Sequence, residues 1–387
     1  MQAEASEASG PGRLAELVRL FGRLGVTAFG GPAAHIAMMH DEVVIRRRWI
    51  DDQHFVDMIG VTNLIPGPNS TEMAMHVGRH RAGWRGLIVA GASFILPAAA
   101  IVLAFAWVYV RHGSTPTGEA LLYGVKPVVI VIVLQALLKL GRTAVKGWLT
   151  GLVAIGGAAG YLVGIDEVLL LAAGALFVLA SRATPGPGSL VLLPVASGGW
   201  VSAPALADTA SLGTIILVFL KAGAFLFGSG YVLFAFLQGD LVDRLGLLTE
   251  QQLLDAVAVG QFTPGPVFTT ATFIGYLLAG LPGAGVATLA IFLPAFLFVG
   301  LMAPLVRRAR DRVWTAALLD GVNAVAVGLM GAVTVVLVGD AVVDAVSMVV
   351  AAVAGLILWR TRLNSAWLLM GAGIAGLIAG AAGWSPG

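Results

Sequence analysis

Cysteine is absent from the chain, which excludes disulfide bonds, thiolate metal ligands and cysteine nucleophiles. Charged residues make up only 11% of the 387 residues, whereas an ordinary soluble domain carries about a quarter. The six histidines lack metal-ligand spacing and no Walker loop is present, so we expect no metal, no cofactor and no direct ATP hydrolysis. The net charge of +2 comes without a basic stripe, which argues against binding to nucleic acid.

Apolar residues dominate the composition instead. They make up 58% of the chain, and runs long enough to cross a membrane, about 20 residues as a helix, recur from residue 86 onward. The 51 glycines and 17 prolines would break helices in water, but in transport proteins they permit close helix contacts and interrupted spans. We therefore predict an all-α, polytopic membrane protein embedded in a lipid bilayer.

The sequence also contains an internal repeat. A shift of 198 residues, the difference between Gly25 and Gly223, lays the first Pro-Gly-Pro triplet on the second. One residue is then lost, and a shift of 197, the difference between Pro97 and Pro294, applies. We therefore divide the chain into a polar tail (1–12), a first transmembrane repeat (13–182), a linker rich in Gly, Pro and Ser (183–207) and a second transmembrane repeat (208–387).

Long spans follow the triplet in each half. They are expected near residues 86–110, 118–138, 148–164 and 167–181, and near 283–306, 313–338, 341–359 and 364–383. The glycine-broken and Pro-Gly-Pro segments before them either cross or enter and return, which leaves the number of crossings open. The tail shows no apolar core with a small-residue cleavage pattern, so no secretory signal is expected and the tail should be cytoplasmic.

Positive charges predict how the halves are oriented, because Lys and Arg in short loops stay on the cytoplasmic side. The first half places them before its first long span (Arg46, Arg47, Arg48, Arg79, Arg81 and Arg85), and the second half after the equivalent span (Arg307, Arg308, Arg310 and Arg312). The two spans should run in opposite directions. Inverted repeats of this kind build many secondary transporters, which bind substrate where the repeats meet.

Each Pro-Gly-Pro triplet is predicted to interrupt a helix. Asp51 and Thr249 are the expected N-caps, the latter with Gln252 in a capping box, and each helix should end at its triplet. A second helix then begins inside the apolar zone, where its unpaired N–H groups and dipole suit an anion. A simple kink is the alternative, which the doubling of the triplet makes weaker.

Three cations lie inside or beside apolar segments. Arg23 and Lys221 share one repeat position, and Lys126 falls within a predicted span where its repeat partner is Asn323. A cation in an apolar run suggests a functional role, although a snorkelling side chain or a helix end would also account for it. The segment Phe29-Gly30-Gly31-Pro32 exposes backbone either to a ligand or for close helix packing.

Glu72 and His76 are one helical turn apart after the first triplet, and the second half has no such pair. This asymmetry makes them candidates for proton coupling, because carboxylates and imidazoles relay protons in membranes. An ordinary intrahelical pair is the alternative. Asp57 and Asp255 occupy equal repeat positions and are expected to pair with arginine.

These motifs resemble the chromate transporter (CHR) family in its long, two-repeat form. The resemblance rests on residues 25–36 (GVTAFGGPAAHI), 47–51 (RRWID), 64–68 (LIPGP), 219–221 (FLK), 261–269 (QFTPGPVFT) and 290–294 (AIFLP). It covers about residues 14 to 380, with one departure at Ser229, where such repeats usually continue with glycine. The resemblance implies export of chromate across the inner membrane of a bacterium, driven by an ion gradient and in competition with sulfate.

We therefore predict a gradient-driven transporter that exports a chromate-type dianion by alternating access, and not an enzyme. A transporter of sulfate or another oxyanion and a passive anion channel are the alternatives, and a homodimer is left open. The predicted coupling residues are Glu72 and His76. The predicted substrate-binding residues, expected to surround one dianion between the two triplets, are Arg23, Gly30, Gly31, Asn63, Gly67, Ser70, Thr71, Lys126, Lys221, Gly228, Gln261, Gly265, Thr269, Thr270 and Asn323.

Overall fold

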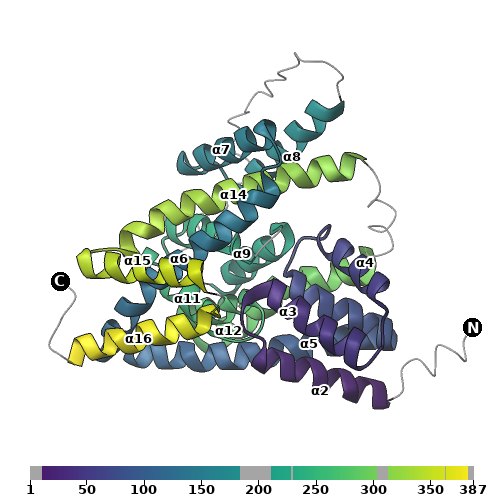
Figure 1. Cartoon of the computed structure of the whole chain (residues 1–387), viewed down its shortest axis with the longest axis horizontal. Coiled ribbons are helices and arrows are strands. Elements are labelled where there is room, and N and C mark those ends of the chain that lie inside the picture. Colours follow the sequence, from purple (N-terminus) through teal and green to yellow (C-terminus); the bar gives the residue numbers. More distant parts are fainter. Residues whose placement is uncertain (1–10, 184–210, 228–229, 303–312, 362, 382–387) are drawn as a thin grey trace, which may run out of the picture.

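The computed structural model describes residues 11–183, 211–227, 230–302, 313–361 and 363–381, and every regular element within them is helical (Figure 1). Nearly all of the predicted tail and linker, together with Gly228 and the four arginines between residues 303 and 312, lie outside the described residues. The all-α fold class predicted from the composition is confirmed.

The two halves contain the same series of elements. The first half consists of α2 (Pro11–Thr27), α3 (Gly31–His40), the π-helical turn η1 (Asp41–Arg46), α4 (Asp52–Thr62), α5 (Asn69–His112), α6 (Pro116–Ala144), α7 (Trp148–Leu162) and α8 (Glu167–Ala183). The second half consists of α9 (Leu212–Phe225), α10 (Leu233–Leu237), η2 (Gln238–Arg244), α11 (Glu250–Phe262), the 3-10 turn η3 (Val267–Thr269), α12 (Thr270–Leu297), η4 (Phe298–Met302), α14 (Val313–Ala341), α15 (Ala345–Arg360) and α16 (Ser365–Ala381).

The long helices agree with the predicted spans. Within the described residues, four stretches are long and apolar enough to cross a membrane: Asn69–His112, Pro116–Ala144, Val267–Leu301 and Trp314–Ala341. Shorter apolar helices accompany them, and large apolar side chains such as Leu289 and Trp359 are exposed on the outer surface. An apolar exterior is stable in lipid and not in water, so the chain is a multi-pass membrane protein.

Helix boundaries follow the predicted capping residues. The Asp51 carboxylate accepts a hydrogen bond from the backbone N–H of His54 at 2.8 Å, which begins α4. Thr249 and Gln252 form the reciprocal capping box of α11, at 3.0 and 3.1 Å. Both helices end just before their triplets, and the next helical segment begins directly after Pro68 or Pro266. The interrupted helices are therefore confirmed in both halves.

A second break in each half has no counterpart in the sequence prediction. Gly83 in α5 and Gly280 in α12 adopt positive φ angles of 60° and 61°, and the chain folds back at each. A side chain added at Gly78 would collide with the backbone of Gly86, and Gly275 meets Gly283 in the same way. Each of these long helices is thus two helices joined by a sharp turn, packed closely through glycine.

The two halves exchange helices. In the second half α14 packs against α7 and α8 of the first, while α6 of the first half packs against α15 and α16 of the second (Figure 1). Two equivalent pairs, α5 with α12 and α6 with α14, meet between the halves. The contacts are reciprocal, because each half contributes helices that pack on the other. The interface between repeats therefore runs through the centre of the molecule.

Candidate substrate site

The Pro-Gly-Pro triplets are buried where the repeats meet. The backbone N–H of Gly67 donates to the carbonyl of Leu226 at 2.8 Å, and that of Gly265 donates to the carbonyl of Ala28 at 2.9 Å. Positive φ angles of 137° and 90° at these glycines allow the turns. The triplets thus face the partner repeat rather than lipid, as the mechanism predicted from the sequence requires.

The hydroxyl groups that follow the triplets are differently placed in the two halves. Thr269 and Thr270 donate to the backbone carbonyls of Pro266 and Val267, both at 2.8 Å, so their hydroxyl hydrogens are already used. Ser70 and Thr71 are buried, and the Thr71 hydroxyl has no hydrogen-bond partner in the described part of the chain. Only the first-half hydroxyls retain a free donor among these predicted ligands.

A polar cavity of about 710 Å³ lies between α6, α11 and α14, beside the end of α5. Its lining includes Lys126, Asp255 and Tyr109 at depth, with Glu119 and Asp340 as further acidic residues. Lys126 is the one predicted substrate-binding residue in its lining. The cavity is formed by both repeats, as expected of a substrate site in a two-repeat transporter.

Lys126 is not an isolated cation. Its Nζ lies 3.3 Å from Oδ1 of Asp255, an ion pair rather than an aligned hydrogen bond, and Tyr109 donates its hydroxyl to Oδ2 at 2.8 Å. The prediction that Asp255 pairs with arginine is therefore wrong, because its partner in space is a lysine from the other repeat. Tyr109 was missed, since it lies in an apolar run without any distinguishing pattern.

A second, smaller polar cavity of about 320 Å³ contains the predicted residues Asn63 and Asn323. It also contains Asp320, whose carboxylate accepts from Lys146 and from Arg182, each at 2.7 Å. The two cations and one carboxylate leave a net positive charge at this cavity. It therefore suits an anion better than the larger cavity, where acidic groups are in excess.

The two cavities lie at opposite ends of the antiparallel α6–α14 pair. Five repeat-equivalent pairs each contribute one residue to each cavity: Tyr123 and Asp320, Lys126 and Asn323, Asp340 and Thr143, Ala341 and Ala144, and Val343 and Lys146. Buried apolar residues, including Val129, Val133, Leu329 and Met330, occupy the helix interface between them. The cavities are thus equivalent vestibules separated by an apolar barrier.

Arg23 and Lys221 belong to one motif that both halves share. Arg23 pairs with Glu42 at 2.6 Å, and Lys221 pairs at 3.1 Å with Asp240, which occupies the repeat position of Glu42. Arginines at equal positions, Arg46 and Arg244, contact the same carboxylates. Contacts duplicated in this way hold the first helix of each half to its π-helical turn.

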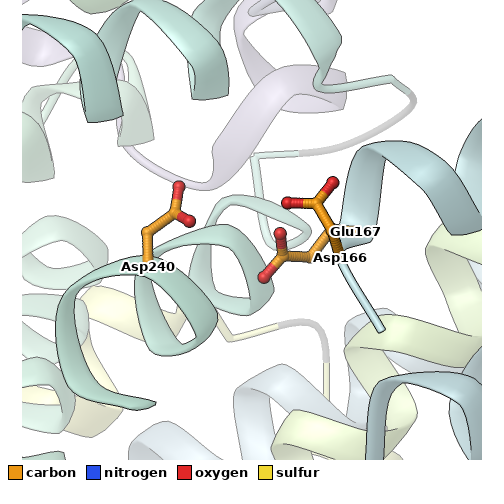
Figure 2. Close-up of side chains that lie close together, drawn as sticks. All are labelled: Asp166, Glu167 and Asp240. Carbon is orange, nitrogen blue, oxygen red and sulfur yellow. The ribbon is translucent and has the colours of Figure 1, made fainter. Parts of the chain in front are cut away.

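Lys221 has two further partners at the N-terminal end of α8. Its Nζ lies 2.8 Å from Asp166 and 3.0 Å from Glu167, and together with Asp240 these carboxylates surround one small space (Figure 2). Their oxygens lie within 4.8 Å of one another. The ammonium group sits among them and offsets one of their three negative charges. Lys221 is therefore paired with carboxylates. This pairing could not be predicted from the apolar residues around Lys221 in the sequence.

The remaining predicted residues are spread over other places. Gly30 and Gly31 line a third cavity of about 690 Å³ at the start of α3, with Lys139 and Asn364. Gln261 is buried and accepts from the Tyr231 hydroxyl at 3.2 Å, while Gly228 lies outside the described residues. The structure thus distributes the predicted set over several sites rather than around one pocket.

Glu72 and His76 are buried on the first helix after the triplet. Glu72 is fully inaccessible, and neither carboxylate oxygen has a hydrogen-bond partner in the described part of the chain. A side chain added at Gly67 would meet this carboxylate directly. An ionised carboxylate without partners is costly in such a place.

The fold and the paired cavities define a class, namely polytopic membrane transporters built from two interlocked repeats with interrupted helices. A model of the family described as chromate transporter matches residues 15–179 and again residues 213–377. The chain therefore belongs to the chromate transporter family.

Individual relatives match over nearly the whole chain. A chromate transport protein of Cupriavidus metallidurans is 37% identical over 95% of this chain and 93% of its own length. A probable chromate transport protein of Synechococcus elongatus is 34% identical, over 94% and 95% respectively. A chromate transport protein of Pseudomonas aeruginosa is 33% identical, over 93% and 91%. The comparison with solved structures gives no match.

Proposed function

We propose that this chain exports chromate, or an oxyanion of the same charge and shape, from the cytoplasm by alternating access. The observation that carries the proposal is the pair of polar cavities at repeat-equivalent positions, one at each end of the α6–α14 pair. Inverted repeats supply two equivalent vestibules, and movement of one repeat against the other opens them in turn. The names of the relatives support chromate as the cargo.

Charge assigns a side of the membrane to each cavity. Lys139, Arg142 and Lys146 gather at the C-terminal end of α6, beside the smaller cavity, whereas Glu119 and Asp340 line the larger one. Because Lys and Arg mark cytoplasmic loops, the smaller cavity faces the cytoplasm. A basic vestibule concentrates a dianion there, and an acidic rim on the other side favours its release.

Lys126 is the cation that we place against the dianion. It is buried at the repeat interface and lines a cavity, whereas Arg23 and Lys221 belong to the carboxylate clusters that both halves share. The backbone N–H groups, Ser70 and Thr71 at the first triplet remain proposed ligands for the state in which the apolar barrier has opened.

The membrane potential is sufficient to drive export. Moving one charge across 100 mV is worth about 2.3 kcal/mol, so a dianion is readily expelled from a negative cytoplasm. Glu72 and His76 remain the proposed pair for any additional proton coupling. The complete burial of Glu72 supports this role, because a carboxyl group in such a place gains or loses a proton only as its surroundings change.

Transport by cells tests the proposal. Cells that express the chain should accumulate less labelled chromate than control cells, and the exported chromium should stay hexavalent. Initial rates in inside-out vesicles should saturate with chromate and fall when the potential is collapsed. Flux that does not saturate would indicate a channel, and reduced chromium an enzyme. Equal accumulation with and without the protein would contradict the proposal.

A further inference from the structure

The ion pair between Lys126 and Asp255 joins the two repeats inside the larger cavity. Lys126 comes from α6 of the first half and Asp255 from α11 of the second, and their side chains are 8% and 2% exposed. Tyr109, from α5, binds the second carboxylate oxygen at 2.8 Å. The Asp255 carboxylate therefore already pairs with Lys126, the cation that we place against the substrate.

The internal repeat shows that the repeat fold does not require this pair. The positions equivalent to Lys126 and Asp255 hold Asn323 and Asp57, so the smaller cavity has an uncharged residue at the place of Lys126. Asp57 is partly exposed and accepts a long hydrogen bond from Gln53 at 3.4 Å. By contrast, each half has its own pair of this second kind, Arg23 with Glu42 in the first half and Lys221 with Asp240 in the second. A pair present in one cavity only is a candidate for function.

A dianion at Lys126 has to compete with the Asp255 carboxylate. Two anions beside one ammonium group repel each other strongly, because the burial of Asp255 keeps water from screening them. The repulsion is removed if Asp255 takes up a proton. The carboxyl group then stays in place, keeps its contact with Tyr109 and offers a hydroxyl donor to a substrate oxygen.

No other described group offers Asp255 a cation. Glu119 and Tyr123 of α6 and Asp340 of α14 share its cavity, and Glu250 begins its own helix. The turn η2 contributes Asp240, Asp243 and Arg244, of which Asp240 binds Lys221 and Arg244 and Asp243 accepts from Gln238. The end of α5 contributes Arg111, which lies over the Trp107 ring, and His112, and neither contacts Asp255. The remaining elements packed on α11, namely α10, α12, α16 and η3, contribute no acidic or basic side chain.

We propose that the oxyanion binds Lys126 together with one proton, which is held by Asp255. The proton is taken from the solution on the side where the substrate enters the site and is released on the opposite side with the substrate. The transported unit then carries one net negative charge, which the membrane potential still expels. This inference rests on the proposed function and adds a linkage between substrate and proton.

Binding of labelled chromate to the purified full chain, measured between pH 6 and pH 9, tests the linkage. Chromate itself takes up a proton near neutral pH, so all variants are compared at each pH. The ratio of the wild-type Kd to the Asp255→Asn Kd should rise about tenfold per pH unit above the pH at which Asp255 loses its proton. Asp255→Asn should bind at least about tenfold more tightly than the wild type at the highest pH.

Two further variants keep the test decisive. Asp57→Asn, the matched control, should follow the wild-type profile, and Tyr109→Phe should shift the profile to higher pH because it removes a donor that stabilises the carboxylate. If Asp255→Asn does not fold, as judged by size-exclusion chromatography, the Tyr109→Phe shift decides. An Asp255→Asn profile parallel to the wild type, or an unshifted Tyr109→Phe profile, would overturn the linkage. Absence of chromate binding to the wild type would instead refute the proposed function.

Discussion

The backbone N–H of Gly67 is bonded to the carbonyl of Leu226, at the end of the first described helix of the other half. The equivalent bond joins Gly265 to Ala28. Each triplet is thus anchored to the partner repeat rather than to its own. Movement of one repeat against the other must either break these two bonds or carry the triplets along, so the triplets are placed to respond to the transport cycle.

Gly67→Ala and Gly265→Ala should both destabilise the protein and reduce transport. An added side chain would collide with the Glu72 carboxylate at the first position and with Ala98 at the second. The positive φ angle costs about 1 to 2 kcal/mol for a residue other than glycine, before the collision is counted. Thermal unfolding in detergent and uptake by vesicles would measure the two effects.

Gly246→Ala is the matched control for these two variants. Gly246 also has a positive φ angle, of 59°, but nothing lies within 4 Å of an added side chain. It should therefore show only the smaller backbone cost. Equal unfolding temperatures for all three variants would show that the close contacts at the triplets do not matter.

Lys221→Met should lower stability more than it changes substrate affinity. The substitution leaves Asp240 buried without this cation, and removal of one partner from a buried ion pair typically costs about 3 to 5 kcal/mol. Lys221→Arg should restore most of the stability, and Lys139→Met, at an exposed position, should leave the unfolding temperature nearly unchanged. A stable Lys221→Met protein that no longer binds chromate would return Lys221 to the substrate site.

Glu72→Gln should fold normally and weaken the response of transport to a proton gradient, leaving the part of the response that Asp255 provides. The substitution keeps the shape of the side chain, and neither oxygen of Glu72 has a hydrogen-bond partner that the change would remove. Chromate flux into inside-out vesicles should be measured with and without an imposed pH difference at constant potential. Glu119→Gln, at an exposed position, is the control. An unchanged response in Glu72→Gln would remove this residue from the coupling pathway.

Asp320→Asn should lower the KM for chromate on the cytoplasmic side by several-fold at low salt. The substitution frees Lys146 and Arg182 from their shared carboxylate and makes the smaller cavity more positive. The effect should fade as salt screens the charges over about 10 Å at 0.1 M. The fold should tolerate the change, because the side chains of Lys146 and Arg182 are 59% and 38% exposed. A KM that is unchanged or raised at low salt would contradict the assignment of this cavity to anion entry.

The positions of the charged partners could not be predicted from the sequence. Lys221 lies in an apolar run, and its three carboxylates come from the N-terminal end of α8 and from η2. Lys126 and Asp255 come from different repeats. Long-range pairing depends on which helices pack together, and the hydrophobic patterns of the helices do not specify the packing partner.

The sequence by itself determined the helices, the two repeats and the breaks at the triplets. These features depend on local chemistry: the Asp51 side chain caps the N–H of His54, and a proline removes a backbone donor and disfavours helical backbone at the residue before it. The tertiary structure alone decided that the repeats exchange helices, that Gly83 turns the chain back and that the cations fall into separate groups. Those outcomes arise from close packing between distant segments, where a single glycine or carboxylate acquires its role only from the surface it meets.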